Sequence, residues 1–156
     1  MFRFLRIIAT HGIALATGFA LGIYLLPILT APEPPSDTEV AASAAGATYT
    51  GEFVRALPGS DILHWGEGTI ALGKDRISFS GAMSPGPDYK LYLTPELVTT
   101  EEEFLAVKNE SARVGDVKTF DNFILPVPED IDLEDYQAVV IWCETFGEFI
   151  TASTYR

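Results

Sequence analysis

The feature that most limits this chain is an uninterrupted apolar segment near its start. Residues Ile7–Leu29 are mostly Ile, Leu, Ala, Gly and Phe, and no charged residue occurs between Arg6 and Glu33. As a helix rising about 1.5 Å per residue, this segment would be roughly 35 Å long, enough to cross a hydrocarbon core of about 30 Å. The sequence therefore predicts one membrane-spanning helix.

The charges on either side of this segment predict its orientation. Arg3 and Arg6 precede it, whereas acidic residues follow it, beginning with Glu33. Because positively charged flanks stay in the cytoplasm, we expect a cytoplasmic N-terminus and a periplasmic or extracellular remainder. A cleaved signal peptide is the alternative, but its apolar region would be shorter, about 7–15 residues. Leu29–Ala31 is also a poor cleavage pattern, because Leu29 is not small.

Beyond the apolar segment, the composition divides the chain into a linker and one domain. Residues 31–48 are rich in Pro, Ala, Ser, Thr and Glu, and the prolines stop a helix and favour an extended tether. The remainder has the length of a single domain. We therefore expect an N-terminal membrane anchor at 1–30, a flexible linker at 31–48 and a folded domain at 49–156.

The net charge of the exported part limits the kinds of partner that it can bind. All 22 acidic residues but only eight of the ten basic residues lie beyond the apolar segment, so this part carries a formal charge of −14. A strongly acidic surface repels phosphate backbones, which argues against binding to nucleic acid. It also disfavours docking on anionic lipid through basic patches. The expected partners that remain are the membrane, through the single N-terminal helix, and another protein.

Short segments with β-type patterns, separated by Gly and Pro, fill the predicted domain. In Ile77–Ser80 apolar residues alternate with hydroxyls, whereas Tyr136–Cys143 is apolar on both faces, as in a central strand. Thr100 and Glu103 have capping-box spacing, which predicts a short helix over 101–107. The pattern predicts an all-β domain, an antiparallel sandwich or barrel. Strands are expected at 49–54, 68–72, 76–80, 89–93, 116–125, 136–143 and 146–153.

Cys143, the only cysteine, ends the strongest of these β-type runs. One thiol cannot form an intramolecular disulfide, so two interpretations stay open. The first is a small apolar core residue, since free cysteines are among the most buried residue types. The second is a redox thiol, because an unpaired thiol in an oxidising compartment is a liability unless it is buried or used.

His64 is the only histidine in the predicted domain and the candidate partner of Cys143. The two are far apart in the sequence, so only folding could bring them together. They could act as base and nucleophile, or as axial ligands of a haem iron. A hydrogen-bonded turn histidine is the simpler interpretation. Two such side chains are too few for a closed structural zinc site, so no metal site is expected.

Several short motifs follow one another in a characteristic order. The most specific are the Gly86-Pro87-Asp88 turn before Tyr89–Leu93 and the strand that runs from Tyr136 through Cys143 to Phe146. Gly51–Phe53, His64–Thr69, Val114–Val117 and Phe123–Pro126 accompany them. The series resembles the DM-thirteen domain, known as the electron transfer DM domain and also found in skeletor-type and DOMON-containing proteins. The resemblance covers nearly all of 49–156, and one domain on one anchor is similar to the bacterial versions.

The resemblance implies a β-rich domain with a characteristic cysteine, matched here by Cys143, and a role in electron transfer. We therefore expect a membrane-anchored extracytoplasmic domain with an accessory role in electron or thiol transfer through Cys143, with His64 beside it. The partner would be a redox or envelope protein. The cofactor is unknown, and haem held by Cys143 and His64 is one candidate. The alternative is a non-enzymatic binding or scaffolding module with a structural cysteine. The sequence has no Cys-x-x-Cys pair and no nucleophile elbow, which argues against a self-contained enzyme.

Overall fold

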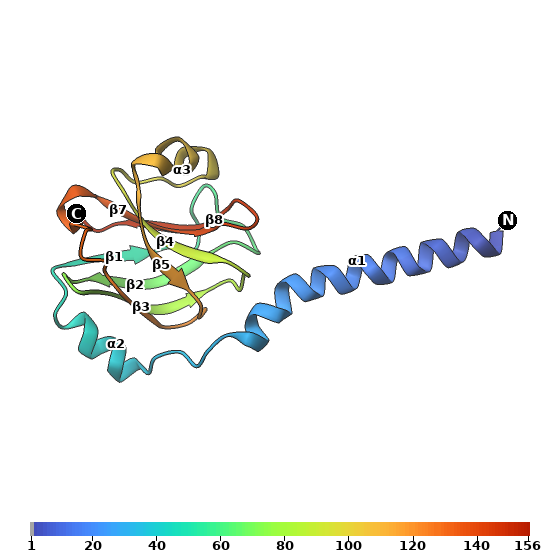
Figure 1. Ribbon diagram of the computed structural model, residues 1–156, viewed down its shortest axis with the longest axis horizontal. Helices are drawn as coiled ribbons and strands as arrows, with labels where there is room; N and C mark the ends of the chain where they lie inside the picture. The colour runs from blue at the N-terminus through green and yellow to red at the C-terminus, as the bar shows by residue number, and fades with distance from the viewer. Residues whose placement is uncertain (1) are drawn as a thin grey trace.

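The computed structural model describes residues 2–156 and shows one long helix joined to a β domain (Figure 1). Helix α1 (Phe2–Thr30) extends away from the domain and has no buried residue. Among residues 2–156 it is the one helix long and apolar enough to cross a membrane. The other elements are α2 (Asp37–Ala44), β1 (Tyr49–Phe53), β2 (Gly66–Leu72), β3 (Arg76–Met83), β4 (Tyr89–Thr94), α3 (Glu101–Val107), β5 (Ala112–Val117), β6 (Phe123–Pro126), β7 (Ala138–Cys143) and β8 (Glu148–Thr154), with 3-10 turns at Lys108–Glu110 and Leu133–Asp135.

The strands form two antiparallel sheets that pack face to face. The first sheet has the order β1-β2-β3-β6, and the second has the order β5-β4-β7-β8. Each sheet keeps its own set of paired strands, so the fold is a sandwich rather than one continuous barrel wall. The predicted antiparallel all-β domain is confirmed, and helix α3 lies on the outer face of the second sheet (Figure 1).

The position of β7 inside the second sheet, with an apolar cluster on each side of it, explains why its sequence is apolar on both faces. Ile141 and Cys143 belong to the core between the two sheets, where Phe79 and Phe123 stack with ring centroids 5.1 Å apart. Trp142 points to the opposite face and packs beneath α3, 4.8 Å from Phe104 between ring centroids. One strand therefore contributes to two apolar clusters, and β4 and β8 flank it on either side.

The predicted strand over 116–125 is wrong, because the chain changes sheets within it. Its first residues belong to β5, which pairs with β4 in the second sheet, whereas β6 pairs with β3 in the first. The crossing is a turn in which the Thr119 hydroxyl donates to the carbonyl of Asn122 at 2.7 Å. Asp121 and Asn122 between Phe120 and Phe123 are typical turn residues, and this signal was missed because the apolar residues on both sides suggested one strand.

The segment 31–48, expected as a flexible linker, contains the short helix α2, which packs on the domain. Ser36 caps α2 through a capping box with Glu39, and Val40 is buried where α2 packs on β3. The side chain of Asn122 donates to the carboxylate of Asp37 at 2.8 Å and to the carbonyl of Pro35 at 3.2 Å. Val40 is the one buried residue of α2, and the Pro- and Ala-rich composition gave no sign that this valine would be covered.

Candidate functional site around Cys143 and His64

Cys143 lies at the end of β7, where the second sheet meets a hairpin turn. It is 2% exposed, and Tyr89 of β4 is its partner across the strands. The N–H of Gly147 donates to the Cys143 carbonyl at 2.9 Å, and Gly147 has a φ of +69° that closes the turn into β8. The thiol is therefore held by fixed backbone on the inner side of the sheet.

A pocket of about 330 Å³ has both Cys143 and His64 in its lining. Folding thus brings the two candidate residues to one place, although they come from opposite ends of the domain sequence. The volume is near the lower end of the range of about 300–1,000 Å³ typical of small-molecule sites. The rest of the lining is mostly apolar and comes from α1 (Ala20, Ile23, Tyr24), the loop before β2 (Leu63), the Pro85–Pro87 turn, Tyr89, and the β7–β8 hairpin and β8 (Phe146, Glu148, Ile150).

His64 is fixed by the carboxylate of Asp61, three residues before it. One Asp61 oxygen accepts from the N–H groups of Leu63 at 2.6 Å and His64 at 2.7 Å. The other oxygen lies 3.1 Å from His64 Nδ1. The N–H of Leu63 is the main cause of the lowered pKa of Asp61. With Nδ1 occupied in this way, Nε2 is the ring nitrogen left for another partner.

Ser84 and Tyr89 connect the histidine loop to the cysteine strand. The Ser84 hydroxyl accepts from the N–H of Trp65 at 3.1 Å, donates to its carbonyl at 3.3 Å and lies 3.5 Å from the Tyr89 hydroxyl. A Cβ at Gly86 would overlap the Tyr89 ring, so this turn lies directly on the phenol. Burial raises the pKa of Tyr89 above its ordinary value, which is already well above neutral pH.

The surroundings of Cys143 keep its thiol neutral. Burial raises the pKa of Cys143, and backbone N–H groups, that of Phe146 first, oppose the rise only in part. No lysine or arginine is found among the described residues that line the pocket. Because the thiolate, not the thiol, is the nucleophile, reaction of Cys143 near neutral pH would need a base that takes the thiol proton.

Glu148 is a further titratable group in this pocket, and the sequence did not point to it. It is the partner of Cys143 across the β7–β8 hairpin. Burial and then the carboxyl group of Glu101 raise the pKa of Glu148. A tight hairpin after Cys143 would have indicated that an early residue of β8 lies beside the cysteine. The length of the turn could not be known from the sequence.

The aromatic residues Trp65, Tyr89, Tyr92 and Trp142 lie in three different places. Tyr89 lines the pocket with Cys143, whereas Tyr92 and Trp142 belong to the cluster beneath α3. Trp65 stacks under the guanidinium of Arg55, 3.6 Å from the ring centroid. Aromatic residues alone therefore did not mark the site.

The pocket leaves little room for a porphyrin beside Cys143. Its volume is at the low end for small-molecule sites, and the Gly86–Pro87 turn and Tyr89 take up the space next to Cys143. Within residues 2–156, no group of three or more His, Cys, Asp or Glu side chains is arranged to hold a metal ion. The narrow space beside Cys143 therefore does not favour haem ligation by Cys143 and His64.

The comparisons with known proteins identify the family. The family model described as electron transfer DM13 matches residues 59–155, which include His64, Cys143 and all strands from β2 to β8. The chain belongs to the electron transfer DM13 family. No curated protein matches the chain, and no solved structure matches it.

Proposed function

We propose that this protein is a membrane-anchored extracytoplasmic redox module, in which Cys143 takes part in electron or thiol transfer with a partner protein. One observation carries the proposal: the buried thiol lies on a pocket that also contains an imidazole held by a carboxylate. A cysteine that only filled the core would need no such neighbours. Membership of a family described by electron transfer supports the same role.

Thiol transfer has a complete atom balance with a partner disulfide. The Cys143 proton moves to His64 or Glu148, and the thiolate attacks one sulfur of the partner disulfide. The partner's sulfur–sulfur bond breaks, a mixed disulfide forms, and the second partner sulfur leaves as a thiolate and takes up the proton. In one-electron transfer, the thiol gives an electron to an oxidised centre of the partner and its proton to the same pocket base.

The membrane placement rests on α1. This helix has the length and composition of a single span, and Arg3 and Arg6 at its start favour a cytoplasmic N-terminus. The DM13 domain would then be periplasmic or extracellular, as in bacterial members with one anchor. A signal sequence at the same place passes the same tests of length and composition, so processing is an outcome to be measured.

A second function is favoured by the burial of Cys143. At 2% exposure, and packed with Ile141 in the core between the sheets, the thiol also suits a purely structural role. The protein would then be a binding or scaffolding module of the cell envelope. Under that alternative, Cys143→Ala lowers stability and leaves partner binding unchanged.

The deciding experiment measures the chemistry of the single thiol in the full chain. Protein purified in detergent with and without air is treated with a disulfide such as oxidised glutathione, and the mass of the adduct at Cys143 is followed over time. We expect an adduct on the folded protein, formed more slowly in the folded His64→Ala variant. Visible spectra and metal analysis of the same samples test for a bound cofactor.

Matched variants separate chemistry from folding. Cys143→Ser should keep the melting temperature within a few degrees and lose adduct formation, whereas Ser60→Ala, outside the pocket lining, should keep both. A colourless, metal-free protein whose Cys143 reacts only after unfolding would defeat the redox proposal and favour the scaffolding alternative.

A further inference from the structure

The ionisable groups of the Cys143 pocket favour one sign of charge. Glu148 lines the pocket, and Asp61 adds a second carboxylate, one oxygen of which lies 3.1 Å from Nδ1 of His64. The described side chains of the lining include neither lysine nor arginine. Unless His64 is protonated, the pocket therefore presents only negative charge.

Glu101 brings a third carboxyl group close to this pocket. It is the first residue of α3, and it lies near enough to Glu148 to raise the pKa of that side chain. Two neighbouring carboxyl groups can share one proton, but together they keep at least one negative charge at neutral pH. Asp61, whose pKa is lowered, is ionised as well, so the negative charge persists in every protonation state of the pair at neutral pH.

The rest of the lining on the domain side is mostly apolar, with Leu63, Phe146 and Ile150 among its residues. The carboxylates, the imidazole and the thiol all come from the domain, so their arrangement does not depend on the position of α1. An apolar lining with carboxylates beside it suits a partner group that is both apolar and positively charged.

Lysines in the adjoining part of the fold do not cancel this charge. Lys90 and Lys118 line a separate pocket that shares Tyr89 with this one. The Lys90 ammonium lies 2.5 Å from a carboxylate oxygen of Asp88 and 3.1 Å from one of Asp116, so its charge is balanced there. The domain as a whole is strongly acidic, so its net charge acts in the same direction as the carboxylates of the pocket.

We propose that the Cys143 pocket selects a disulfide flanked by positive charge, so that the partner protein presents its reactive disulfide in a basic, apolar segment. This inference rests on the thiol transfer proposed above. A cleft with charge of one sign raises the association rate of an oppositely charged group by about 10–10³-fold. The same carboxylates repel anionic disulfides, so the pocket discriminates between partners by charge.

Three small disulfides of similar size test the selection: cystamine is a dication, hydroxyethyl disulfide is neutral and dithiodipropionate is a dianion. In each reaction a bond forms between Cys143 and one reagent sulfur, the sulfur–sulfur bond of the reagent breaks, and the other half leaves as a thiolate that takes up the Cys143 proton. The adduct on the full chain in non-ionic detergent is followed by mass, and each rate is divided by that of the same reagent with mercaptoethanol. At low salt we expect cystamine to react at least about tenfold faster than dithiodipropionate. This preference should be largely lost at about 1 M salt, where the Debye length is about 3 Å.

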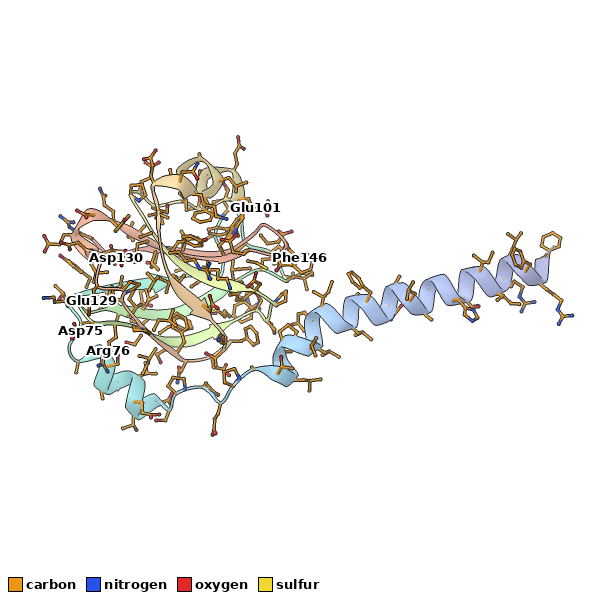
Figure 2. The ribbon with its side chains drawn as sticks, viewed as in Figure 1. Asp75, Arg76, Glu101, Glu129, Asp130 and Phe146 are labelled. Carbon is orange, nitrogen blue, oxygen red and sulfur yellow. The ribbon has the colours of Figure 1, made fainter. Side chains whose placement is uncertain are left out.

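Charge reversal at two exposed glutamates separates local charge from net charge. Glu101→Lys should lower the preference for cystamine severalfold, because it places a cation beside Glu148, and it should leave the rate with neutral hydroxyethyl disulfide unchanged. Glu129→Lys is the matched control, since it makes the same change in net charge on the side of the domain away from Glu101 and Phe146 (Figure 2). It should leave the preference unchanged, and both variants must keep the wild-type melting temperature.

Failure of this inference can be told apart from failure of the redox proposal. If hydroxyethyl disulfide gives no adduct until the protein unfolds, the redox proposal fails and this inference fails with it. If it gives an adduct but the corrected rates do not rise from dithiodipropionate to cystamine, thiol transfer stands and selection by charge is overturned. Equal effects of Glu101→Lys and Glu129→Lys would also overturn it, because net charge alone would then explain the preference.

Discussion

Tyr89 of β4 and Cys143 of β7 face each other across the central strand pair of the second sheet. Residues directly opposite in antiparallel strands have their side chains on the same face, so the phenol and the thiol lie next to each other in the core. Tyr89 also extends toward Ser84, which holds the loop that carries His64. This one pair thus joins the cysteine strand to the histidine loop.

The turn over Tyr89 should tolerate no side chain at residue 86. In Gly86→Ala the new Cβ would overlap the Tyr89 ring, so we expect a loss of about 1–3 kcal/mol in the free energy of unfolding. Gly115→Ala is the control, because its nearest neighbour is a Leu125 carbon at 3.9 Å. That variant should be neutral or gain less than about 1 kcal/mol. Urea unfolding of both variants gives the comparison, and equal losses would contradict the close packing.

The raised pKa of Cys143 predicts how the contribution of its thiol to the stability of the fold changes with pH. Burial raises this pKa in the folded protein, so the thiol stabilises the fold below the ordinary thiol pKa of about 8.5, and this contribution is lost as pH rises through the folded value. Wild type should therefore lose more stability than Cys143→Ala between neutral and alkaline pH. Thermal unfolding across that range measures the difference, and parallel curves would show that the thiol has an ordinary pKa.

The ion pair of Lys108 and Glu144 predicts sensitivity to acid. Burial raises the pKa of Glu144, but hydrogen bonds from Lys108 at 2.7 Å and from Tyr92 outweigh burial, so the net pKa is lowered. The carboxylate therefore stabilises the fold above its ordinary pKa, and this stability is lost as pH falls through the lower folded value. The ammonium also lies 5.5 Å from the Trp142 ring centroid, a cation–π contact.

Removing this lysine tests the prediction. Lys108→Met should cost about 1 kcal/mol at neutral pH and reduce the loss of stability in acid, because Glu144 loses its strongest partner. Lys74→Met, at an exposed lysine, should change neither quantity. Unfolding curves at neutral and at acid pH measure both, and an unchanged acid response in Lys108→Met would show that the pair contributes nothing.

Docking of α2 depends on one valine. Val40→Ala removes buried methyl groups where α2 packs on β3, so we expect a loss of about 1–2 kcal/mol. Protease cleavage within 31–48 should become faster, because α2 detaches more often. Val54→Ala, at a half-exposed valine, should leave the cleavage rate unchanged. The same rate in both variants would indicate that α2 is not held by this contact.

The sequence by itself determined the long apolar helix, the all-β class and the family, because these depend on local composition and on short patterns. The capping pattern at Thr100 placed α3 at its observed bounds. The alternation in Ala138–Cys143 placed Cys143 and Trp142 on opposite faces of one strand, as the two apolar clusters show. These features depend on residues close together in the sequence, because helices and strands each repeat their geometry at a fixed number of residues.

Only the tertiary structure decided which distant residues meet. It divided the segment 116–125 between two sheets, folded α2 onto β3, and brought His64, Tyr89 and Glu148 to the pocket of Cys143. Each of these outcomes depends on strand pairing and on burial between segments far apart in the chain. A local pattern shows which face of a strand is apolar, but it does not show which strand or helix will cover that face.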